Sequence, residues 1–209
     1  MVDIVMRERK VSKNRDKEYK VVGIDLAGAE NRETGWALLQ GYNIKVLTLY
    51  SNEEILRKTL EVRPLIVAID APLTLPKKGK MRLADKEMKK LGCAVLPPLF
   101  PGMKMLTSRG IYLASKMQES GIKVIEVHPT SSRKILGLPV AKDVEKIRHS
   151  LLKLGLKGDI EERKLTIHEL DAIVAAFTAK LHIHGQTVKV GNKEEGYIII
   201  PSLSVKRVE

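Results

Sequence analysis

Two short apolar runs in this chain each end on an aspartate. VVGID ends at Asp25 and LIVAID ends at Asp70, and both are uncharged before that final carboxylate. Such runs are typical of strands that are buried on both faces of a mixed or parallel sheet. If the two strands are adjacent and parallel, their carboxyl ends lie at the same sheet edge, about 5 Å apart. Open α/β sheets place their functional sites at that edge, so we expect Asp25 and Asp70 to lie close together there.

Turn signals and apolar periodicity place these two strands in a longer α/β pattern, in which three strands are followed by alternating helices and strands. Expected strands cover residues 20–27, 36–39, 44–51, 65–70 and 123–129; expected helices cover 51–62, 83–91, 107–121 and 166–185, with short helices within 131–164 and extended pieces at 187–191 and 195–201. The length of 209 residues and the 44% hydrophobic content fit a single domain over residues 20–209. Residues 1–19 are basic and form either a tail or an extra edge strand.

Two further acids fall at corresponding places in this pattern. Glu126 lies just before the end of the fifth expected strand, and Asp171 lies one turn inside the last helix. A capping box from Thr166 to Glu169 predicts where that helix begins. Carboxylates that share a partly buried site repel one another, so either their pKa values rise or a cation neutralises them. Each acid alone also has a structural interpretation, because an aspartate after a strand often only fixes a turn.

The candidate catalytic acids are therefore Asp25, Asp70, Asp171 and Glu126, and the first three are the candidate metal ligands. Hard oxygen ligands suit Mg²⁺ or Mn²⁺. Two such ions about 4 Å apart can activate a water molecule, bind a phosphodiester and stabilise the leaving oxygen of an in-line displacement.

The charge of the chain indicates a polyanionic partner. There are 37 Lys and Arg residues against 25 Asp and Glu residues, a formal charge of +12. Such a charge attracts nucleic acid through its phosphate backbone, although a thermophilic protein can be rich in charged residues for stability alone. The segment KKGKMRLADKEMKK, residues 77–90, follows the strand that ends at Asp70 and includes the candidate phosphate contacts Lys77, Lys78 and Lys80. The alternative for this segment is a solvated helix face.

Other features bear on location and recognition. The single cysteine, Cys93, cannot form an intramolecular disulfide, and no apolar segment is long enough for a signal peptide or a membrane span. These features predict a cytoplasmic protein without membrane association. Aromatic residues make up only 4% of the chain, so nucleic acid would be recognised by backbone shape more than by base stacking. The oligomeric state is left open, with a homodimer as one option.

Several motifs, taken in order, resemble the domain-of-unknown-function family 429, whose members are described as predicted nucleases with a ribonuclease H-like fold. The resemblance is carried by GIDLAG with TGWALL, VAIDAPL, RLADKE, TSRG, VIEVHP, HELDAIVAA and EGYIIIP, from about residue 20 to residue 201. It implies a mixed five-stranded sheet flanked by helices. The acids of strand one, strand four and the last helix, which are Asp25, Asp70 and Asp171, would form a metal site, with Glu126 as an additional acid.

Further residues match the same family pattern: Arg82 and Asp85 in RLADKE, Arg109 in TSRG and His128 in VIEVHP. Arg82 or Arg109 could bind a phosphate in bidentate fashion, or could form a surface salt bridge. His128 and His168 could relay protons near neutral pH, or could have structural roles beside a strand end and a helix cap.

Together these features favour an enzyme that hydrolyses phosphodiester bonds of DNA or RNA with a divalent metal. One alternative is a non-catalytic adaptor that binds nucleic acid through the same charge. A less favoured alternative is an actin-like or sugar-kinase-like phosphotransferase, because GIDLAG followed by TGWALL resembles the phosphate hairpin of that fold. Such enzymes pair two related domains around a nucleotide, and this chain has the length for one.

Overall fold

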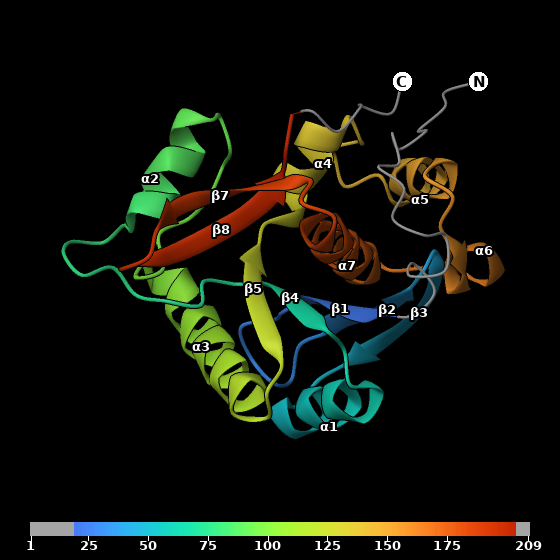
Figure 1. Cartoon of the computed structure of the whole chain (residues 1–209), viewed down its shortest axis with the longest axis horizontal. Helices are drawn as coiled ribbons and strands as arrows, with labels where there is room; N and C mark the ends of the chain where they lie inside the picture. Colours follow the sequence, from blue (N-terminus) through green and yellow to red (C-terminus); the bar gives the residue numbers. More distant parts are fainter. Residues whose placement is uncertain (1–18, 204–209) are drawn as a thin grey trace.

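A computed structural model describes residues 19–203 and shows one mixed sheet with helices on both faces (Figure 1). The strands are β1 (Lys20–Asp25), β2 (Thr34–Gln40), β3 (Asn43–Leu49), β4 (Ile66–Asp70), β5 (Lys123–Val127), β6 (Lys157–Gly158), β7 (Thr187–Asn192) and β8 (Gly196–Pro201). The helices are α1 (Asn52–Val62), α2 (Leu83–Lys90), α3 (Lys104–Glu119), α4 (Pro129–Leu136), α5 (Val144–Lys153), α6 (Asp159–Glu162) and α7 (Ile167–Ile183). None of these helices is long and apolar enough to cross a membrane. The prediction for residues 1–19 lies, apart from Tyr19, outside the described range.

Within residues 19–203 the sheet contains eight strands and not the five expected. Its order is β6-β3-β2-β1-β4-β5-β8-β7, so the five expected strands form its centre, and β1, β4 and β5 are parallel. The two extended pieces near the C-terminus form the β7–β8 hairpin, and β8 pairs with β5 through Glu126 and Val127. This pairing covers part of an edge of β5 that would otherwise expose unpaired backbone groups. Helix α3 begins three residues earlier than expected, after a 3₁₀ turn at Pro101–Met103.

Two hydrophobic cores lie on opposite faces of the sheet. Helix α7 covers one face, while α1 and α3 cover the other (Figure 1). Successive side chains of β1 and β4 point alternately to these two faces of the sheet. Ile24 and Ile69 belong to the core under α1 and α3, so the residues that follow them, Asp25 and Asp70, lie on the α7 side.

Helix α7 lies unusually close to the sheet because two glycines leave room for its backbone. A Cβ atom at Gly23 in β1 would lie 2.1 Å from the carbonyl oxygen of Ala172, and one at Gly35 in β2 would lie 2.0 Å from that of His168. Both distances are far below van der Waals contact. This close packing brings the first turns of α7, which carry His168 and Asp171, to the ends of β1 and β4.

Candidate metal and catalytic site

Asp25 and Asp70 lie side by side at the carboxyl ends of β1 and β4. The two strands are parallel and the two aspartates are register partners, as expected from the sequence. Adjacent strands are about 4.8 Å apart, so the two carboxylates share one small region of the sheet edge. Both residues are half-buried. The pairing begins with Val21 opposite Ile66. Both strands then run for the same number of residues, so their final aspartates lie opposite each other.

Helix α7 adds Asp171 and His168 to this edge. The helix begins after Thr166, and the expected capping box with Glu169 is confirmed: the backbone N–H of Thr166 donates to the Glu169 carboxylate at 2.9 Å. Glu169 also accepts from Arg163 at 2.6 Å, so its carboxylate stabilises the start of the helix. The Nδ1 atom of His168 lies 2.7 Å from Oδ2 of Asp25. Asp25, Asp70 and Asp171 are called the acidic site below.

The charges of the acidic site repel one another. Burial raises the pKa of Asp70 well above its usual range, and the negative charges of Asp25 and Asp171 raise it further. Burial also raises the pKa of Asp171 to about 6, although Arg133 opposes this change. The hydrogen bond to Asp25 raises the pKa of His168. A bound cation would relieve this repulsion, because it stabilises the ionised form of each carboxylate.

The oxygen donors of the acidic site fit a hard divalent cation such as Mg²⁺ or Mn²⁺. One carboxylate oxygen of Asp171, Oδ1, is buried and accepts no hydrogen bond. Within residues 19–203, however, no group of three or more acidic, histidine or cysteine side chains is already arranged to hold a metal ion. Asp25 and Asp70 are the two carboxylates of the site that register pairing brings together at this sheet edge.

A cavity of about 220 Å³ opens beside the two strand ends. Asp25 and Asp70 lie in its wall, and the segments before and within the start of α3 contribute Leu96, Met103 and Leu106. Asp171 is not among the residues that line this cavity. A ligand in the cavity would thus reach the carboxylates of β1 and β4 before that of α7.

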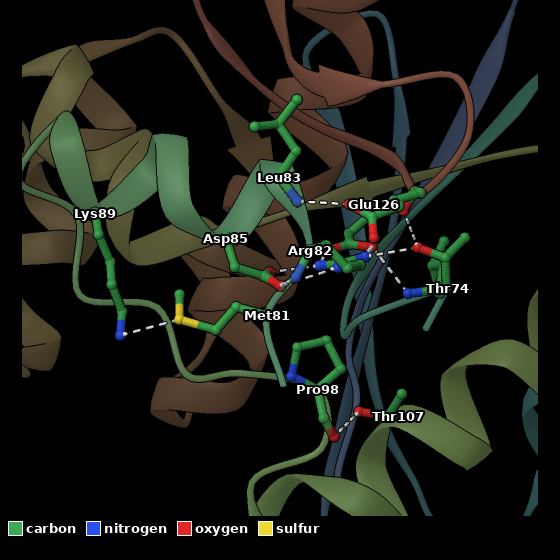
Figure 2. A network of polar contacts seen from close by, with 11 residues as sticks. Thr74, Met81, Arg82, Leu83, Asp85, Lys89, Pro98, Thr107 and Glu126 are labelled. Atoms are coloured by element: carbon green, nitrogen blue, oxygen red, sulfur yellow. Dashed lines mark hydrogen bonds and ion pairs between the residues drawn. The ribbon is translucent and has the colours of Figure 1, made fainter. Parts of the chain in front are cut away.

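Glu126 does not join the acidic site as a free carboxylate, because Arg82 binds both of its oxygens (Figure 2). The two contacts measure 2.7 and 2.6 Å, and the backbone N–H of Leu73 donates to Glu126 at 2.8 Å. The same guanidinium also binds Asp85 at 2.8 Å and Thr74 at 2.9 Å. Of the two roles that the sequence left open for Arg82, a phosphate contact and a salt bridge, the structure shows an ion pair with Glu126, and it is buried, with Arg82 only 1% exposed.

We expect Arg82→Met to lower the free energy of unfolding by roughly 3 kcal/mol, because it leaves the buried carboxylates of Glu126 and Asp85 without their cation. Denaturant unfolding measures this change, and Lys86→Met is the matched control, at an exposed position of α2, the helix that begins directly after Arg82. A change below about 1 kcal/mol in Arg82→Met would show that the ion pair does not stabilise the fold.

Arg109 and His128 also have structural partners that the sequence did not reveal. The guanidinium of Arg109 donates to the carbonyl oxygens of Ala27, Ala29 and Tyr50, so it orders the loop after β1 instead of facing solvent. His128 caps α4 by accepting from the backbone N–H of Ser131. Burial lowers the pKa of His128 to about 4, so this ring stays neutral near pH 7 and is poorly suited to relay protons there.

The basic loop between β4 and α2 is anchored to the turn of the β7–β8 hairpin. Glu195 accepts from the backbone N–H of Lys77 at 2.8 Å, and the Nζ atom of Lys77 pairs with Glu194 at 2.8 Å. Lys78 and Lys80 are exposed. The loop therefore has a fixed position but presents free positive charge to solvent at these two residues.

Sequence reasoning missed Arg133, which contacts the acidic site. This residue lies on α4, is 1% exposed, and places its Nη1 atom 3.4 Å from Oδ1 of Asp171. Pro129 at the start of α4 marks the beginning of a helix, but the sequence does not show which side of that helix faces α7.

The strands β1, β2 and β3 form an antiparallel meander, which β4 and β5 continue, and α7 covers one face of these central strands. This arrangement defines an α/β protein with a ribonuclease H-like fold. Over residues 23–196 the sequence matches the family described as "Protein of unknown function (DUF429)". Because this match spans most of the chain, the protein belongs to that family, as the sequence motifs predicted.

Two solved structures of RuvC from Thermus thermophilus are similar to this chain, one of them described as being in complex with Holliday junction substrate. Each is 16% identical to it and covers 79% of this chain and 96% of its own, with TM-scores of 0.48 and 0.47. None of the curated proteins matches the chain.

Proposed function

We propose that this protein is a cytoplasmic nuclease that hydrolyses phosphodiester bonds of DNA or RNA with the help of Mg²⁺ or Mn²⁺. The observation that carries the proposal is the register pairing of Asp25 with Asp70, beside Asp171, at the sheet edge where a cavity opens. The raised pKa values of Asp70 and Asp171 support a site that requires a cation.

The side chains of the site have separate roles in this proposal. Asp25 and Asp70 would hold the cation, and a bound cation would supply Lewis-acid activation of the phosphodiester and of a water molecule. His168 orients the Asp25 carboxylate through its 2.7 Å contact, which would leave the other oxygen of Asp25 for the cation. The exposed Lys78 and Lys80 attract the phosphate backbone, and the anchored loop fixes their position relative to the cavity.

One observation favours the adaptor alternative, in which the protein binds nucleic acid without cutting it. Within residues 19–203 no set of three acidic, histidine or cysteine side chains forms a ready metal site, and Glu126 is occupied by Arg82. An adaptor would use the basic loop alone and would need no divalent ion.

Incubation with single-stranded, duplex, hybrid and branched nucleic acids separates the two functions. We expect cleavage of at least one substrate with Mg²⁺ or Mn²⁺ and none with a chelator, and binding that weakens steeply as salt rises. The Asp25→Asn variant, purified in parallel, controls for contaminating nucleases. Metal-independent binding without cleavage of any substrate would favour the adaptor and contradict the nuclease.

A further inference from the structure

Arg133 is a buried cation whose hydrogen-bonding capacity is largely unused. Its side chain is 1% exposed, and its Nε and Nη1 atoms donate no hydrogen bond. Its Nη2 atom reaches only Thr130 on its own helix, at 3.4 Å. Buried guanidinium donors that make no hydrogen bond are costly, so a position that serves the stability of the fold alone would normally satisfy them.

The charge of Arg133 is directed at the acidic site. Its Nη1 atom lies 3.4 Å from Oδ1 of Asp171, which is itself buried and accepts no hydrogen bond. Helices α4 and α7 pack against each other, and the hydroxyl oxygens of Ser132 and Thr178 lie 3.1 Å apart between them. The packing of the two helices therefore holds a positive charge beside one particular carboxylate.

This arrangement divides the acidic site into two parts. Asp25 and Asp70 line the cavity and face an incoming ligand, whereas Asp171 does not line it and has one oxygen turned to Arg133. Of the neighbouring acids, Glu126 and Asp85 pair with Arg82 and together carry one negative charge more than it does. Arg133 offsets one of the three negative charges that the ionised carboxylates of the acidic site carry.

We infer that Arg133 is the fixed positive charge on the Asp171 side of the site. Because of this charge, the site binds one divalent cation instead of two, and that cation binds at Asp25 and Asp70. Arg133 is thus a positioning residue that holds the Asp171 carboxylate away from metal coordination. The inference rests on the metal binding of the proposed function, but it concerns the number of ions and can be tested without any cleavage.

Titration of the full chain with Mn²⁺, followed by the electron paramagnetic resonance signal of the free ion, counts the ions bound. We expect one Mn²⁺ per chain in the wild type and in Arg133→Lys, which keeps the charge. In Arg133→Met the Asp171 carboxylate is released, and we expect a second Mn²⁺ to bind. The double variant Arg133→Met with Asp171→Asn removes both charges of the pair and should again bind one ion.

Each other outcome has a definite meaning. Two ions in the wild type, or one ion in a folded Arg133→Met, would overturn the inference and leave the nuclease proposal standing. If Arg133→Met does not fold, the double variant decides: loss of its Mn²⁺ would show that Asp171 is a required ligand and overturn the inference. One ion without cleavage of any substrate would support the inference while the nuclease proposal fails. No bound ion in the wild type would overturn both.

Discussion

The variant Gly23→Ala should lose about 4–5 kcal/mol of unfolding free energy or fail to fold, which is an exceptional cost for one methyl group. The added Cβ would lie 2.1 Å from the carbonyl oxygen of Ala172 and 2.3 Å from the backbone nitrogen of Ala176. Backbone atoms of a buried helix cannot rotate away, so α7 must move from the sheet. Because α7 carries Asp171 and His168, the acidic site should be disrupted as well.

Denaturant unfolding measures this loss, and Gly28→Ala is the matched control. A Cβ atom at Gly28 would meet Leu106 at 3.6 Å, which is ordinary van der Waals contact, so we expect a change within about 1 kcal/mol. If Gly23→Ala were as stable as Gly28→Ala, the close packing of α7 against β1 would not be a requirement of the fold.

The variant Asp70→Asn should lose cleavage by roughly 10³-fold or more while its metal-free form becomes more stable at pH 7. The loss follows from removing one of the two carboxylates that hold the cation. The gain follows from the raised pKa of Asp70, because the ionised carboxylate opposes folding and each pKa unit corresponds to about 1.4 kcal/mol. As the pH falls below about 4, Asp70 is protonated in both folded and unfolded chains, so the stability gain should disappear.

Single-turnover assays measure the loss of cleavage. Unfolding curves of chelator-treated protein measure the gain in stability for the same variant. Glu53→Gln replaces an exposed carboxylate on α1 and should change neither quantity. A variant Asp70→Asn that cleaves at the wild-type rate would exclude Asp70 from the reaction. A variant that is less stable than the wild type at pH 7 would show that the ionised carboxylate supports the fold.

The central part of the fold and site could be predicted because its signals are local. The runs that end at Asp25 and Asp70 are charge-free until their last residue, and parallel pairing of such runs aligns the two ends. The start of α7 could be placed from the capping box of Thr166 and Glu169, which spans four residues of sequence. Asp171 then follows from helical geometry.

The features that could not be predicted are two buried ion pairs and one strand pairing, and each depends on residues that are distant in sequence. Arg82 and Glu126 are 44 positions apart, and their ion pair depends on how α2 packs against the β7–β8 hairpin, which pairs with β5. The same holds for Arg133 and Asp171, which α4 and α7 bring together. Charged residues such as arginine are exposed in most proteins, so the residue type favours a surface position for both Arg82 and Arg133. The pairing of β8 with β5 was missed because it extends over only two register pairs.

Anomalous diffraction from crystals soaked in Mn²⁺ tests the metal site most directly. We expect one peak between the carboxylates of Asp25 and Asp70, within about 2.2 Å of an oxygen from each. No peak at this sheet edge, or a peak held only by residues elsewhere, would contradict the claim that these two aspartates form a metal site.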